Sequence, residues 1–112
     1  VSLRATQRAF AGLCADGSVI TWGQADYGGD SQHVREQLYD IRQLVASSAA
    51  FAALRGDGRV VCWGHGCSGG DSSRVSDALT EVESIQSSEV GFAAAKSDGS
   101  VVVWGHPHYV NF

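Results

Sequence analysis

The densest group of reactive side chains in this 112-residue chain is the segment Cys62-Trp-Gly-His65-Gly-Cys67. Two thiols and an imidazole within six residues are ligands that zinc accepts, although no fourth ligand is apparent nearby. The two thiols are also close enough in sequence to form a disulfide across a bend. With Cys14 the cysteine count is three, so one thiol stays free or pairs between chains. We expect unpaired thiols, with the Cys62–Cys67 disulfide and the zinc site as alternatives.

Two Asp-Ser pairs, Asp30-Ser31 and Asp71-Ser72, place a carboxylate beside a hydroxyl. Such groups serve as an acid and a nucleophile when a positioned histidine completes the set. No histidine accompanies both pairs, so we interpret the aspartates as turn-capping residues. The sequence therefore predicts no catalytic residue, and we expect that the protein is not an enzyme.

The histidines and the glycine pairs have a similarly structural interpretation. His65 and His106 lie 41 residues apart, with His108 close by, and we expect exposed loop histidines; a ligand contact is the alternative. The glycines at 28–29 and 69–70 lack the Lys-Ser/Thr that follows a phosphate-binding loop. We therefore expect no cofactor and no bound metal.

Composition limits the classes of partner. The net charge is −4 and the sequence pI is about 5.4, without a basic stripe, which argues against nucleic acid. No apolar run approaches the ~18 residues of a membrane span, so we expect no direct membrane span. The chain contains no methionine, so we expect that Val1 is not a natural translation start and that the chain was processed, excised or taken from something longer.

Three residue types recur together at an interval of 41 residues. A fixed period of about 40 residues is typical of solenoids and propellers. Residues found in every copy are predicted to be architectural, and residues that break the repeat are candidates for function. The recurring positions are Phe10, Phe51 and Phe92; Asp16-Gly17, Asp57-Gly58 and Asp98-Gly99; and Trp22, Trp63 and Trp104.

Each copy has the pattern of a small antiparallel sheet. An Asp-Gly pair between two apolar runs predicts a hairpin, because glycine accepts the positive φ of a tight turn. The flanking strands are apolar on both faces, which indicates sheets covered on both sides. We expect the three tryptophans to be mostly buried between neighbouring sheets. For the connectors we expect a short fourth strand at 31–34 and 72–75, followed by either one helical turn or an extended loop.

The predicted fold is all-β, with three propeller-type antiparallel blades forming a partial or open β-propeller. The chain is one repeat domain, 1–112, with blade 1 at about 1–43, blade 2 at about 44–84 and a truncated blade 3 at about 85–112. Three blades do not close a ring by themselves, so apolar faces are expected to remain at both ends of the array.

The repeated pattern of Ala-Leu, x-Asp-Gly, Val-Val-x-Trp-Gly and Ser-x-x-Val resembles the regulator-of-chromosome-condensation type repeat. It is closer to the shorter-period version in β-lactamase inhibitor protein II, and the best match runs over 51–64 and 69–75. The resemblance implies β-propeller blades. The Gly-Gly-Asp-Ser connector also resembles predicted repeat proteins of unicellular algae, which makes an organellar complex one candidate location.

The function expected from these features is a non-enzymatic protein-interaction or structural module within a larger complex or oligomer. Exposed apolar faces mark binding surfaces, and repeat arrays need caps at their ends. The alternative that the resemblance implies is a regulatory propeller: a small-GTPase exchange factor, a ubiquitin-ligase recognition domain or an enzyme inhibitor. The first blade is expected to present Phe10 and the third Trp104, together with the candidate partner-facing residues Leu3, Leu13, Val101, Val103, His106, Tyr109 and Phe112.

Overall fold

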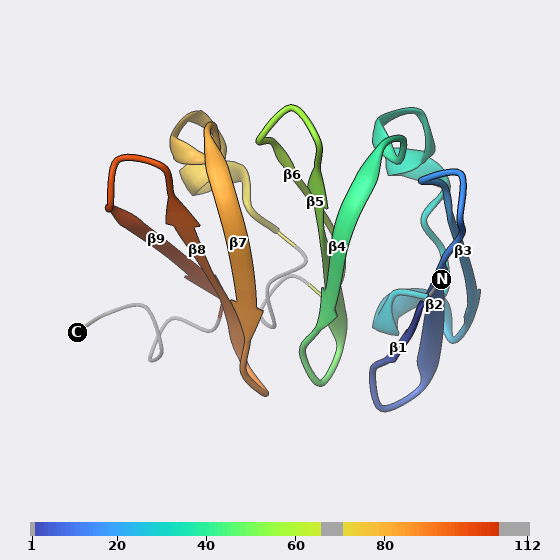
Figure 1. Cartoon of the computed structure of the whole chain (residues 1–112). Coiled ribbons are helices and arrows are strands. Elements are labelled where there is room, and N and C mark those ends of the chain that lie inside the picture. Colours follow the sequence, from blue (N-terminus) through green and yellow to red (C-terminus); the bar gives the residue numbers. More distant parts are fainter. Residues whose placement is uncertain (1, 66–70, 106–112) are drawn as a thin grey trace.

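The chain folds into three antiparallel sheets of three strands each, which stand side by side in Figure 1. The computed structural model describes residues 2–65 and 71–105. The sheets do not close into a ring, and together they confirm the predicted all-β fold with three blades. The strands are β1 (Ser2–Ala5), β2 (Ala9–Leu13) and β3 (Val19–Gly23) in blade 1; β4 (Ile41–Ala46), β5 (Ala50–Arg55) and β6 (Val60–Gly64) in blade 2; and β7 (Val82–Ser87), β8 (Gly91–Lys96) and β9 (Val101–Gly105) in blade 3.

The sheets begin slightly earlier in the chain than the predicted blade boundaries. Blade 2 starts at Ile41 and blade 3 at Val82, because the first strand of each sheet includes the apolar residues that end the preceding connector. No helix in the described part of the chain is long and apolar enough to cross a membrane.

The Asp-Gly hairpins form as predicted in all three blades. The glycine follows a tight turn and has φ of +87°, +84° and +87° at Gly17, Gly58 and Gly99. The preceding aspartate carboxylate accepts the backbone N–H two residues further on, at 2.9 to 3.1 Å. A three-residue loop with glycine in the left-handed region joins two strands without breaking their register.

The connectors are 3-10 helices, and the fourth strand predicted at 31–34 and 72–75 is wrong. The helices η2 (Gln32–Gln37) and η4 (Ser73–Ala78) follow the shorter η1 (Ala25–Tyr27). The apolar spacing of the connector buries Val34 and Leu38 against the core between blades 1 and 2, and helical turns satisfy that spacing. Each connector packs against the outermost strand of the next blade, η2 on β6 and η4 on β9.

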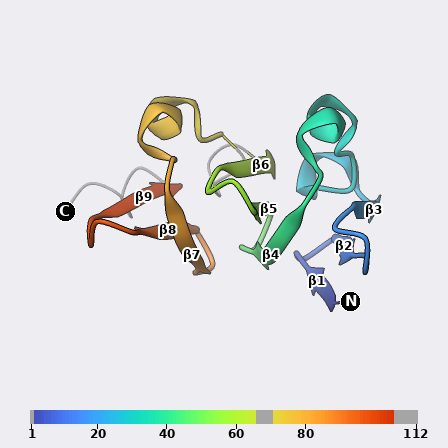
Figure 2. The ribbon, with the colours of Figure 1, turned by 45° about the horizontal axis from the view of Figure 1, so that its top comes forward.

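Backbone hydrogen bonds tie each blade to the next at both ends of the strands. At one end Ile41 N–H donates to Gly17 O (2.9 Å), and Val82 N–H donates to Gly58 O (3.0 Å). At the other end the Ser48 carbonyl accepts the N–H of Gln7 in blade 1, and the Ser48 N–H donates to the carbonyl of Glu89 in blade 3. The first strands β1, β4 and β7 are neighbours, on the opposite side of the fan from the 3-10 helices (Figure 2).

Gly58 and Gly99 have matching φ but different surroundings, which gives a controlled prediction. A Cβ on Gly58 would lie 3.0 Å from the Glu81 backbone, whereas one on Gly99 would meet nothing within 4 Å. Gly99→Ala should therefore lower the free energy of unfolding by about 1 kcal/mol through backbone strain alone. Gly58→Ala should cost at least about 1 kcal/mol more, measured by urea denaturation. Equal losses in the two variants would contradict the close approach of blades 2 and 3.

Candidate interaction surfaces

The two blade junctions are built in the same way. The later blade contributes a Phe-Trp pair, and the earlier blade contributes a surface that includes two alanines. Phe51 and Trp63 of blade 2 pack in one core cluster with Ala9 and Ala11 of blade 1. The equivalent residues of the second junction are Phe92 and Trp104 of blade 3, which pack with Ala50, Ala52, Leu54 and Cys62 of blade 2.

A glycine and a ring nitrogen complete the first junction. Trp63 Nε1 donates a hydrogen bond of 3.1 Å to Gly28 O in the connector. A Cβ on Gly28 would lie 2.5 Å from the Phe51 ring, so only glycine allows the connector this close. From the sequence, Gly28 was predicted only to lie in a loop that binds no phosphate; its recurrence as Gly69 after the next Trp-Gly was the available signal.

In the part of the chain that the structure describes, no blade packs against the side of blade 1 that carries Phe10 and Trp22. Strand register puts Leu3, Gly12 and Ile20 in one row of that surface and Phe10 and Trp22 in the next. The Phe10 and Trp22 rings stack with centroids 5.6 Å apart. We call this surface the blade 1 face: Leu3, Phe10, Gly12, Ile20 and Trp22.

Exposure separates the blade 1 face from its counterparts. Leu3, Phe10, Ile20 and Trp22 are 64, 47, 56 and 44 % exposed. Their equivalents in blade 2, which are Leu44, Phe51, Val61 and Trp63, are at most 3 % exposed. The prediction of mostly buried tryptophans is thus confirmed for Trp63 and Trp104 and wrong for Trp22, since the aromatic side of each blade points toward the blade before it.

The opposite end of the array presents small residues. Ala93, Ala95, Val101 and Val103 lie on the side of blade 3 that points away from blade 2, and Val101 is 62 % exposed. We call these four residues the blade 3 face. The expectation that Trp104 would be presented here is wrong, because its ring is buried against blade 2.

The other candidate partner-facing residues are placed differently. Leu13 packs against the core between blades 1 and 2, on the opposite side of its sheet from Leu3, which corrects the expectation that the two share an exposed face. His106, Tyr109 and Phe112 lie outside the described residues.

Cys62 is a buried free thiol at the junction of blades 2 and 3. Burial raises the pKa of this thiol to about 12, and hydrogen bonding with Ser72 and Trp104 offsets only part of that effect. A buried neutral thiol is a poor zinc ligand and a poor nucleophile. Cys67 lies outside the described residues, which contain no cluster of three potential metal ligands.

The Asp30-Ser31 pair has a structural role. The Asp30 carboxylate accepts the N–H of Gln32 at 3.0 Å, as expected of a turn-capping residue. The Ser31 hydroxyl lies 2.9 Å from the Thr21 hydroxyl, joining the connector to β3. These contacts hold the connector against its own blade.

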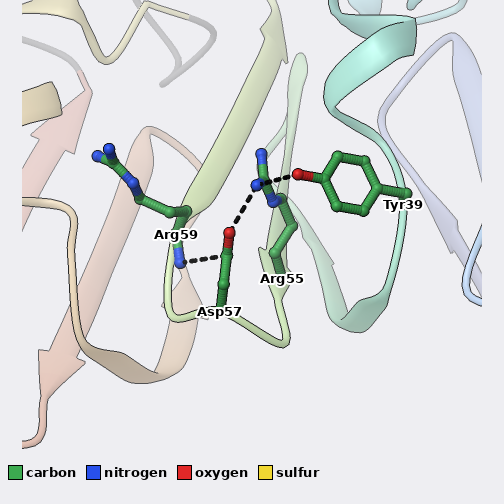
Figure 3. A network of polar contacts seen from close by, with 4 residues as sticks. All are labelled: Tyr39, Arg55, Asp57 and Arg59. Carbon is green, nitrogen blue, oxygen red and sulfur yellow. Dashed lines mark hydrogen bonds and ion pairs between the residues drawn. The ribbon is translucent and has the colours of Figure 1, made fainter.

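One polar network is specific to blade 2 (Figure 3). The Arg55 guanidinium hydrogen-bonds with the Tyr39 hydroxyl, forms an ion pair with Asp57 and lies 4.3 Å from the centre of the Tyr39 ring. The residues equivalent to Arg55 are Cys14 and Lys96. The network joins the end of the first connector to the β5–β6 hairpin, and Arg55 Nε is buried without a hydrogen bond.

Comparisons with known proteins support the fold. A scan against protein-family models and a search of curated proteins found no significant match. The structure of Kap60 bound to yeast RCC1 (Prp20) matches with a TM-score of 0.70 and 22 % identity, over 93 % of this chain and 29 % of that one. Human WBSCR16 matches with a TM-score of 0.66 and 24 % identity, over 94 % and 34 % respectively.

A third similar structure is the ectodomain of the Physcomitrella patens receptor kinase CR4, with a TM-score of 0.63, 16 % identity, and coverage of 99 % of this chain and 31 % of that one. The chain spans about a third of the length of the structures it matches. It shares the fold of the regulator-of-chromosome-condensation type β-propellers, as the repeat pattern predicted.

Equivalent tryptophans should contribute very differently to stability. Trp63→Ala should lower the free energy of unfolding by about 3–5 kcal/mol, because it leaves a cavity in a closed junction. Trp22→Ala should cost less than about 1 kcal/mol in dilute solution, because this residue is already 44 % exposed. Urea denaturation at low micromolar concentration measures both. A loss at Trp22 as large as at Trp63 would contradict an open blade 1 face.

Cys62 should make stability depend on pH in alkaline solution. Above about pH 9 the unfolded chain loses the thiol proton while the folded chain keeps it, so the free energy of unfolding falls by roughly 1 kcal/mol per pH unit up to about pH 12. Cys62→Val, which copies Val103 of blade 3, should remove this component. Urea denaturation at pH 7.5 and pH 10, with reductant present, measures the free energy of unfolding of the wild type and of Cys62→Val. Parallel pH dependence in both would show that the thiol titrates normally in the fold.

Proposed function

We propose that this chain is a non-enzymatic protein-interaction module that works as part of a larger assembly. The observation that supports the proposal best is the blade 1 face. Four large apolar side chains are about half exposed there, while their equivalents in blades 2 and 3 are covered by the preceding blade. Contiguous apolar surface of this kind is typical of contact sites between proteins.

The composition of the blade 1 face also suits a protein contact. Aromatic residues are enriched and charged residues depleted at the centres of interfaces. The five positions of the face include a phenylalanine and a tryptophan and no charged residue. Stacked rings are rigid, so little side-chain entropy is lost when a partner covers them.

Two of the groups with catalytic potential have structural roles that support a non-enzymatic function. The Asp30 carboxylate caps a turn, and Cys62 is buried with its pKa raised. Nucleophilic catalysis needs an accessible, activated group beside a base. Neither residue offers that arrangement.

The alternative is a regulatory propeller domain. The solved structures of similar fold include yeast RCC1 (Prp20) bound to Kap60, and a study of Prp20p names its binding to Gsp1p and histones. This likeness favours a regulatory role for a longer protein that contains these blades. Nucleotide exchange on a small GTPase, assayed with the chain in its full-length context, would distinguish this alternative from a purely structural module.

Site-specific photo-crosslinking tests the proposed interaction. A photoreactive benzoyl-phenylalanine at Leu3, in the blade 1 face, should crosslink to protein when the chain is illuminated in an extract of its source cells. The matched control position is Arg59, an exposed residue in the β5–β6 turn. Mass spectrometry identifies the adducts, whether a second copy or another protein. Protein crosslinks that are no more frequent at Leu3 than at Arg59 would refute the proposal.

A further inference from the structure

We propose that the blade 1 face binds the blade 3 face of a second copy of this chain, head to tail, in the geometry of the two internal junctions. This inference rests on the proposed interaction function and names its partner. The two terminal faces are the two halves of a contact that the chain already makes twice within itself.

The first argument is the match in size between the faces. In both internal junctions a leucine or isoleucine, a phenylalanine and a tryptophan of one blade pack against alanines of the other. The blade 1 face carries Leu3, Phe10 and Trp22 at these positions, and the blade 3 positions equivalent to the alanines are occupied by Gly91 and Ala93. Two blade 1 faces would oppose large rings to large rings, whereas head-to-tail contact pairs large with small.

The second argument is that the polar groups of a junction are also presented at the ends. Gly17 and Gly58 each accept an N–H from the next blade, whereas Gly99 faces open space and no described residue donates to its carbonyl. Likewise, Gln7 and Ser48 each donate an N–H to the next blade. Among the described residues, none accepts the equivalent N–H of Glu89.

The third argument is charge. The strand positions that form the two faces carry no charged side chain, so association buries no unpaired ion. Since the two faces are different surfaces, the contact is heterologous: it extends until the copies close a ring, or it continues as an open array.

The test uses two complementary variants of the chain. Ile20→Glu places a charge in the blade 1 face and leaves the blade 3 face intact; Val101→Glu does the reverse. Both residues are more than half exposed, so the blades should still fold. Ile20→Val, which copies Val61, and Val101→Ile are matched controls that keep both faces apolar. Circular dichroism checks that each variant folds. If a glutamate variant fails to fold, the serine variant at the same position, Ile20→Ser or Val101→Ser, replaces it.

Sedimentation equilibrium at tens of micromolar gives the outcomes. Wild type and controls should associate with rising concentration, each glutamate variant alone should stay monomeric, and their equimolar mixture should double in mass as a one-to-one dimer. Self-association of the Val101→Glu chain alone would show contact between two blade 1 faces and overturn the head-to-tail proposal. A monomeric mixture, or a monomeric wild type, would also overturn it. In those cases a Leu3 crosslink to another protein would leave the interaction function standing.

Discussion

The packing of a Phe-Trp pair against the alanines of the preceding blade is the interaction on which the rest of the structure depends. A three-stranded sheet has two faces, and here both are apolar, so no single blade can bury its own surface. Phe51 and Trp63 cover one neighbour, while Ala50 and Ala52 receive the rings of the other. The aromatic pairs bury large areas, and alanine lets the sheets approach closely enough for that burial.

The direction in which the rings of each blade point decides which blade surfaces are covered by a neighbouring blade and which are exposed. Rings point toward the N-terminal neighbour in every blade, so the end of the array near the N-terminus exposes rings and the other end exposes alanine and valine. The hydrogen bonds follow the same direction, since Ile41 and Val82 donate to glycine carbonyls of the blade before them. Any protein that covers an end must therefore match either an aromatic or a small-residue surface.

Most of the fold could be predicted from the sequence, because its signals are local and repeated. The Asp-Gly turns, the strands around them and the number of blades all follow from short-range pattern. The secondary structure of the connector was harder to predict, because the sequence from Ser31 to Val34 is equally compatible with a strand and with a 3-10 turn. Only the packing of Leu38 against blade 2 decides between the two. The facing direction of Trp22 could not be predicted, because alternation along a strand shows that two faces exist but not which neighbour each one meets.

The hairpin connections inside each blade have a consequence for how the chain folds. The strands of a blade are paired through short turns, so each sheet can form from contacts that are close in sequence, with little loop-closure entropy to overcome. We therefore expect the junctions to form between blades that are already ordered, and the array to unfold from its ends. Amide hydrogens of β5, which is covered on both faces, should be the last to exchange with solvent, because opening them requires both junctions to separate.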